Sequence, residues 1–266
     1  MRHLTIAAAS AALLLLISCA GTQVPETVAG NEIGGSEIKN LIGIIEAINR
    51  TAPSSFTASF FVEGTMAGKK FKTMGDAEFD RNTGKMYVSF IDFIFRTPIT
   101  SMYKNADKIN LYSHVEKILF DDSYKNFRIG RYTEVNIDFK SVYALATGSI
   151  PLIDGYRIRK GARDAKTGMD YIILENGDFF QTIGMKAGVP NRIMLVSKDT
   201  KEKFEFYMEK PDRKGGSMYF RKITLVSKSP EARFDISFNG VRMNVPVNVK
   251  TVDALKLPNE VRKIKM

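Results

Sequence analysis

The side chains that most often carry out catalysis are scarce in this sequence. It has two histidines, His3 and His114, one cysteine, Cys19, and one adjacent acidic pair, Asp121-Asp122. A metal site of imidazole and thiolate ligands needs several such residues together, and His3 lies in an N-terminal segment that we expect to be removed. We therefore interpret His114 as a surface residue and Asp121-Asp122 as part of a turn. The sequence predicts a protein that is not an enzyme and that has no metal site and no cofactor.

Residues 64–70 have a superficial likeness to a phosphate-binding loop. Their sequence, GTMAGKK, has one residue too few between the glycines, and no Ser or Thr follows the lysines. A phosphate-binding loop also leads into a helix, whereas the residues after Lys70 have the pattern of a strand. We predict a hairpin turn here.

The most informative residue is Cys19, which ends a segment with the layout of a secretory signal. A basic residue, Arg2, stands near its start and is followed by an uncharged apolar run over residues 4–17. The run is shorter than the ~20 residues that a membrane-spanning helix needs, and it leads to small residues, as at a cleavage site. Residues 16–19, Leu-Ile-Ser-Cys, resemble the lipobox of bacterial lipoproteins. The resemblance implies removal of residues 1–18 and attachment of diacylglycerol to Cys19.

The alternative is cleavage by an ordinary signal peptidase near Ala20, which would leave Cys19 without a role. Lipid attachment is favoured because the chain has no second cysteine for an internal disulfide. Two or three acyl chains anchor a protein durably, where a single chain does not. Ala20 and Gly21 follow Cys19 without an Asp, and under the sorting rule of enterobacteria this favours the outer membrane. We expect a lipid-anchored outer-membrane protein that faces the periplasm.

The chain is basic, with a formal net charge of +10, or +9 without Arg2 (10 − 1). Such a balance suits nucleic acid, anionic lipid or acidic partners. Export argues against nucleic acid, and the Lys and Arg residues are dispersed as singlets and doublets. We favour a solvated basic surface that faces anionic head groups over a specific anion-binding site.

Hydrophobic periodicity divides the remaining 248 residues (266 − 18) into a tether and one domain. Residues 19–35 lack periodicity and are typical of a flexible tether. Residues 36–50 have apolar side chains at helical spacing, with Ser36 as N-cap, and residues 138–147 predict a second helix. Much of the rest alternates with period two between turn signals, which predicts about ten or eleven antiparallel strands. We expect residues 36–266 to form a single domain.

A long, strongly twisted antiparallel sheet tends to curl. With helices across its concave face, it forms an unclosed half-barrel whose interior can hold an apolar ligand. The predicted fold class is therefore mainly β, with one curved antiparallel sheet and helices that cover the concave face. The residues that we predict to line a lipid-binding cavity are Phe60, Val62, Met86, Val88, Leu111, Phe204, Phe206, Ile223 and Leu225. The competing interpretation is that these side chains form an ordinary filled core.

Alternation is lost in residues 90–99, which are rich in aromatic and branched apolar residues. Pro98 interrupts any central strand. One interpretation is a strand buried on both faces, which also gives a continuous apolar run. The other is a protruding apolar loop that contacts a membrane or a lipid-bearing partner. Composition alone favours the buried strand.

The order of these elements resembles the LolA/LolB lipoprotein-localisation family, and the lipobox favours the LolB side. The shared features are an early helix, a meander that begins near Ser54, and a mid-chain helix that ends in residues 148–151, Gly-Ser-Ile-Pro. Two further stretches that share the pattern are residues 190–195, Pro-Asn-Arg-Ile-Met-Leu, and residues 203–206, Lys-Phe-Glu-Phe.

The resemblance implies an unclosed barrel whose hydrophobic cavity holds acyl chains. It also implies that the protein receives lipoproteins, from a periplasmic carrier protein, and releases them into the outer membrane without covalent chemistry. An apolar loop between early strands serves release in LolB-like proteins, which makes Phe93, Ile94 and Phe95 candidates for membrane contact. This raises the loop interpretation to equal standing with the buried strand. The alternative function is a structural or interaction lipoprotein whose sheet surface binds another envelope protein. In either case we expect a monomer.

Overall fold

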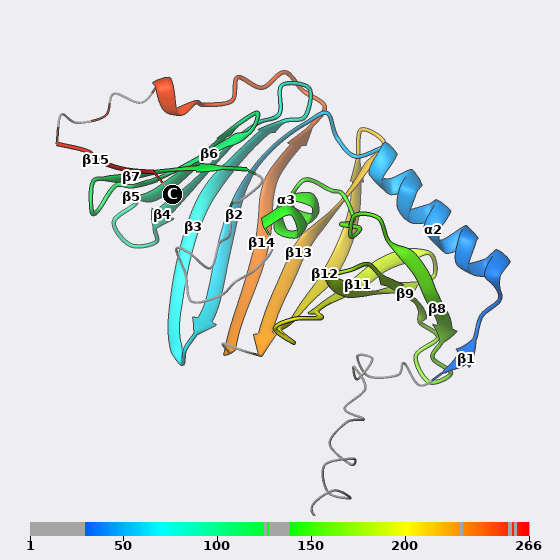
Figure 1. Ribbon diagram of the computed structural model, residues 1–266. Coiled ribbons are helices and arrows are strands. Elements are labelled where there is room, and N and C mark those ends of the chain that lie inside the picture. Colours follow the sequence, from blue (N-terminus) through cyan, green and yellow to red (C-terminus); the bar gives the residue numbers. More distant parts are fainter. Residues whose placement is uncertain are drawn as a thin grey trace, which may run out of the picture.

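The computed structural model describes residues 30–124, 127, 139–228, 231–254, 257 and 260–265. Within them the chain forms one large curved sheet of 15 strands, and two α-helices lie against it (Figure 1). The predicted fold class, a mainly β curved antiparallel sheet that does not close into a barrel, is confirmed. The predicted signal peptide and Cys19 lie outside the described residues. No helix among the described residues is long and apolar enough to cross a membrane.

The sheet consists of two antiparallel meanders joined side by side. The first contains β2 (Ser55–Met66), β3 (Lys69–Asp80), β4 (Lys85–Asp92), β5 (Pro98–Asn105), β6 (Lys108–Ser113) and β7 (Ile118–Ser123). The second contains β8 (Arg157–Arg163), β9 (Asp170–Glu175), β10 (Phe179–Lys186), β11 (Val189–Ser197), β12 (Lys203–Lys214), β13 (Ser217–Lys228) and β14 (Glu231–Met243). They meet where β14 pairs with β2, so the last long strand lies beside the first.

Short strands form both edges of the sheet. At one edge β1 (Asn31–Glu32) pairs with β8, and at the other β15 (Arg262–Lys265) pairs in parallel with β7. Ile33, directly after β1, is buried in the core. The folded domain therefore begins before residue 36, and the predicted tether extends too far at its C-terminal end. Strands as short as β1 and β15 carry too few residues for alternation to show.

Helix α2 (Gly35–Arg50) buries the apolar stripe that its sequence predicts. Its buried residues lie on one face of the helix and are Ile38, Leu41, Ile42, Ile45 and Ile48. The N-cap is Gly34, and no side chain caps the helix. Ser36 therefore lies inside the first turn, and its prediction as the N-cap is wrong.

Helix α3 (Phe139–Ala146) lies within the curve of the sheet (Figure 1). Leu145 joins the main core, and the ring of Tyr143 packs edge-on against Phe79, with ring centroids 5.1 Å apart. Asp138, the predicted cap of this helix, lies outside the described residues. After α3, the backbone of Ile150 exchanges two hydrogen bonds with the side chain of Asn49 at the end of α2. The ends of the two helices are thus fixed to each other.

The two faces of the sheet have different partners. The inner face, which we define as the one that carries α2 and α3, holds the main core. On the outer face, Tyr87, Tyr103, Tyr112 and Leu119 of the first meander form a smaller cluster with Val249. Val249 belongs to the C-terminal segment that runs through a 3₁₀-helix, η2 (Val252–Ala254), to β15. This segment covers part of the outer face.

Candidate functional site

All nine side chains predicted to line a cavity point to the inner face. Residues paired directly across antiparallel strands share a face, and the ladder pairs Phe60 with Phe238, Val62 with Ile236, and Ile236 with Ile223. The same rule, applied strand by strand, places the remaining predicted residues on this face. The strand pairs that connect these residues to β2 and β14 are β2–β3, β3–β4, β4–β5, β5–β6, β12–β13 and β13–β14.

Seven of the nine are buried, and they belong to packed clusters: Phe60, Val62, Met86, Phe204, Phe206, Ile223 and Leu225. Helix α2 contributes five of the buried residues in the main cluster. Val88 and Leu111, on β4 and β6, are only half-buried. Contact of these nine residues with acyl chains stays a prediction.

Other half-buried apolar side chains share the inner face with Val88 and Leu111. They come from the first meander and from β14, and they are Met66, Phe71, Phe90, Met102, Phe120, Phe234 and Ile236. The rings of Phe60 and Phe90 lie 5.4 Å apart, and those of Phe71 and Phe234 lie 5.6 Å apart. The sequence analysis did not single these residues out, although their alternation with polar neighbours was the available signal.

The predicted apolar loop is a turn between β4 and β5. Ile94 and Phe95 are 77% and 76% exposed, and Phe93 is 44% exposed. The side chain of Asp92 fixes the turn, because its Oδ1 accepts hydrogen bonds from the N–H groups of Ile94 (2.9 Å) and Phe95 (2.6 Å). Arg96 completes the turn with a φ of 59°. A strand buried on both faces, which composition alone favours, is therefore wrong here.

A second exposed apolar residue stands beside this turn. Val115 is 75% exposed between β6 and β7. The preceding N–H group, of His114, donates a hydrogen bond to the carbonyl oxygen of Ile99 (2.9 Å), next to the start of β5. The two turns are therefore neighbours at the same end of these strands. The sequence analysis did not single out Val115.

Of the features first considered for chemistry, His114, Asp121-Asp122 and residues 64–70 lie within the described residues. His114 is half-buried, with Nε2 2.9 Å from Oγ of Ser101 and its ring against Tyr112, and burial lowers the pKa of its imidazole. Its side chain is thus partly packed and partly exposed. Asp121 and Asp122 lie within β7, so their prediction as part of a turn is wrong. The predicted hairpin turn in residues 64–70 is confirmed, since β2 and β3 pair as far as Met66 and Lys69. Among the residues that the structure describes, no cluster of His, Cys, Asp or Glu could hold a metal ion.

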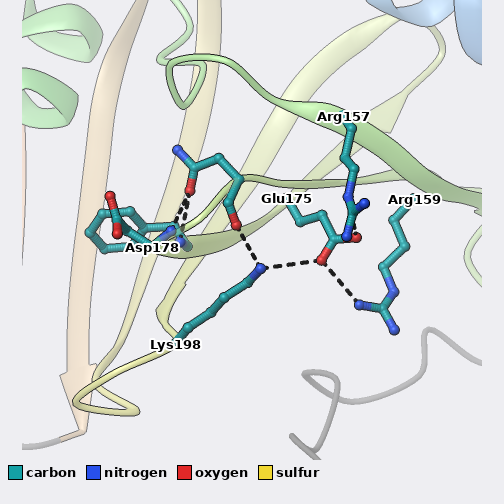
Figure 2. A network of polar contacts seen from close by, with 7 residues as sticks. Arg157, Arg159, Glu175, Asp178 and Lys198 are labelled. Atoms are coloured by element: carbon teal, nitrogen blue, oxygen red, sulfur yellow. Dashed lines mark hydrogen bonds and ion pairs between the residues drawn. The ribbon is translucent and has the colours of Figure 1, made fainter.

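Ion pairs stabilise the outer face of the second meander. Glu175, on β9, accepts contacts from Arg157 (2.9 Å), Arg159 (3.2 Å) and Lys198 (3.3 Å), as Figure 2 shows. Burial alone would raise the pKa of this carboxyl group, but the three cations outweigh that effect and lower it. The ammonium group of Lys198 also lies 4.5 Å from the ring centroid of Phe180. The cations outnumber the carboxylate, which leaves this region basic.

A second buried carboxylate on the outer face, Glu205 of β12, has a similar environment. Arg192, Lys203 and Tyr207 contact it at 2.7, 2.9 and 2.5 Å. Burial would raise its pKa, but these hydrogen bonds and charges lower it to about 2. These outer-face networks contrast with the apolar inner face, so any apolar ligand has one face available to it.

Comparison with known proteins identifies the class of fold. No protein-family model matches the sequence, and no curated protein is similar to it in sequence. Solved structures are similar in fold. A DUF1329 family protein from Desulfovibrio piger has 11% identity and a TM-score of 0.58, over 79% of this chain and 95% of that one.

Two further structures carry names that bear on the fold. A LolA superfamily protein from Nitrosomonas europaea has 10% identity and a TM-score of 0.56, over 81% of this chain and 99% of that one. A domain named for outer membrane lipoprotein sorting, from Vibrio parahaemolyticus, has 13% identity and a TM-score of 0.56, over 79% and 95% of the two chains. This protein therefore has the unclosed β-barrel fold of LolA-like proteins.

Proposed function

We propose that this protein is a lipid-anchored envelope protein, attached through acylated Cys19, that binds acyl chains or lipoproteins on its inner face. It receives them from a periplasmic carrier and delivers them to the outer membrane without covalent chemistry. The names of two structural relatives, which refer to the LolA superfamily and to outer membrane lipoprotein sorting, support this proposal.

The observation that carries the proposal is the set of half-buried apolar side chains on the inner face. Val88 of β4 pairs with Met102, and Met102 pairs with Leu111 of β6, which gives a continuous apolar row across three strands. Each of the three remains partly exposed. Burial of apolar surface contributes roughly 25 cal/mol per Å², so an acyl chain along this row would bind without directional chemistry.

The second candidate function is an interaction lipoprotein that binds another envelope protein. One observation favours it: seven of the nine predicted lining residues are buried in packed clusters. In this case α2 and the side chains of the sheet fill the half-barrel, and the surface supplies the activity. The two functions differ in whether lipid accompanies the purified protein.

Native mass spectrometry of residues 20–266, purified from bacterial cells without the lipid anchor, tests the proposal. Val88→Glu introduces a charge on the inner face, and Val226→Glu is the matched control. Val226 is also a half-buried strand valine, but it points to the outer face, since its neighbour Leu225 is in the inner core. We expect an acyl-chain ligand on the wild type and on Val226→Glu, and its loss from Val88→Glu.

A wild-type mass without ligand, and without uptake of added lipid or lipopeptide, would contradict the carrier function and leave the interaction protein. Equal loss of ligand from both variants would show that the inner face is not the binding surface. Circular dichroism of both variants establishes whether they fold.

A further inference from the structure

Strands β13 and β14 pair along only part of their length. Their ladder runs from Lys228 and Glu231 to Lys222 and Ser237, although β13 begins at Ser217 and β14 continues to Met243. Beyond the ladder, β14 remains paired with β2 through a bulge between Asn239 and Arg242.

Where the backbones of β13 and β14 separate, side chains connect β14 and the residue after it to the end of β12 and the start of β13. The ammonium group of Lys214 donates a hydrogen bond to the carbonyl oxygen of Val241 (2.7 Å). The side chain of Asn244 donates to the carbonyl oxygen of Gly215 and to Oγ of Ser217, both at 3.3 Å. Hydrogen bonds from side chains therefore connect the two sides of the gap where the backbone ladder is absent.

A hollow of about 340 Å³ lies in this gap. Its floor consists of three buried side chains, Tyr219, Phe238 and Val241, and its rim of exposed residues, which are Lys214, Arg221, Asn239, Gly240 and Arg242. Ligand-binding pockets in proteins combine the same features, an apolar floor and a few polar groups, and begin at about 300 Å³.

The charge of the rim is not balanced. Three cations line the hollow and no carboxylate does. Just outside it, Asp212 pairs with Arg221, whose Nε and Nη2 both contact Oδ2 (2.8 and 2.5 Å), and therefore offsets one of the three charges. Lys214 and Arg242 have uncharged partners in the contacts described, namely the carbonyl of Val241 and the hydroxyl of Thr57.

The cations are also fixed in place. The hydroxyl of Tyr219 donates to Asp212 (3.0 Å), which in turn holds Arg221. Arg242 donates from Nε to Oγ1 of Thr57 (3.2 Å). Fixed cations lose little side-chain freedom when an anion binds, and preorganisation of this kind raises affinity.

We propose that this hollow binds a small organic phosphate. Arg and Lys are the side chains suited to phosphate, which Arg recognises with its planar fork and Lys as a point charge. The phosphate would lie between Lys214 and Arg242, and the organic part would lie on the floor of Tyr219 and Phe238. The site is at the end of β14 where β2 begins, whereas the Phe93–Phe95 turn lies near the other end of β2. It is therefore separate from the Phe93–Phe95 turn and from the row of Val88, Met102 and Leu111, although its floor residue Phe238 pairs with Phe60 on the inner face.

Isothermal titration of the full chain in neutral detergent micelles tests the site. The probes are inorganic phosphate, sn-glycerol 3-phosphate, and micelles doped with phosphatidylglycerol in place of phosphatidylcholine. The test variant is Lys214→Gln with Arg242→Gln. The control is Lys39→Gln with Lys166→Gln, which removes the same charge from exposed positions on α2 and the β8–β9 turn.

We expect glycerol phosphate to bind more tightly than inorganic phosphate, with at least a tenfold loss in the test variant and none in the control. Binding of phosphatidylglycerol alone, with the same dependence on Lys214 and Arg242, would support the site and assign the phosphate to a lipid head group. The proposal is overturned if no probe binds to the wild type, or if the control loses as much affinity as the test variant. Unchanged thermal unfolding of both variants establishes that the sheet is intact.

Discussion

The exposed turn at Phe93, Ile94 and Phe95 allows a quantitative prediction about membrane contact. Complete burial of a large apolar side chain is worth about 1.5–3 kcal/mol. Ile94 and Phe95 are each about three-quarters exposed, so their transfer into a bilayer should contribute about 2–4.5 kcal/mol together. Ile94→Ser with Phe95→Ser should therefore weaken insertion of the turn by a factor between about 30 and about 2 × 10³.

The same change should leave the free energy of unfolding almost unaltered, within about 0.5 kcal/mol, because these side chains are exposed in the folded protein. Oδ1 of Asp92 accepts its hydrogen bonds from the backbone N–H groups of residues 94 and 95, so these bonds survive the substitution of the side chains. Loss of membrane contact without loss of stability is the signature that separates a membrane-contacting turn from a part of the core.

The sequence has no tryptophan, which provides the assay. Phe93→Trp introduces a single fluorophore beside Ile94, and Val245→Trp introduces one near the opposite end of the strands. In liposomes that contain brominated lipid, we expect quenching of the Trp at position 93 and its loss in the double serine variant. The Trp at position 245 should not be quenched. Equal quenching at both positions, or quenching that survives the serine substitutions, would refute the reasoning.

Two further predictions concern stability. The pKa of Glu205 is lowered to about 2 in the folded protein. Its carboxylate therefore contributes to the free energy of unfolding above the ordinary carboxyl pKa, and this contribution is lost as the pH falls toward 2. Glu205→Gln should remove it. Between pH 4.5 and pH 2, the free energy of unfolding should fall less in the variant than in the wild type, by about 2 kcal/mol after solvent screening. Denaturation at several pH values measures this difference, and an identical pH dependence of the two proteins would contradict the prediction. Ile45→Ala, at a side chain with no exposure in α2, should cost about 2–5 kcal/mol in urea denaturation. Ile44→Ala, at the half-buried neighbour, should cost clearly less, and equal losses would mean that α2 does not pack as described.

Periodicity predicted the fold well where elements are long. The stripe of α2 and the alternation of β2 each depend on one dominant buried face, so the pattern repeats over enough residues to identify the element. The same alternation placed all nine predicted lining residues on one face. It could not show that seven of them are buried, because their coverage by the helices and by other strands depends on how distant segments pack.

The turn at Phe93 was harder to predict because its composition suits two environments. A run of apolar residues occurs both in strands buried on two faces and in exposed contact sites. Asp92 distinguishes them, since its side chain caps the backbone of a tight turn, but an Asp before an apolar run is a weak signal. The hollow between β13 and β14 had no signal at all, because it arises where two strands stop pairing.

The pairing of β14 with β2 has a consequence for how the chain acquires its structure. Each meander is built from neighbours in sequence, so each can form from local hairpins. The contact between β14 and β2 joins residues from nearly opposite ends of the domain, and loop closure over such a distance slows folding. The joining of the two meanders is therefore the late step. Until it occurs, the edges of β2 and β14 are both unpaired, and a chaperone that shields either edge would protect this protein from aggregation.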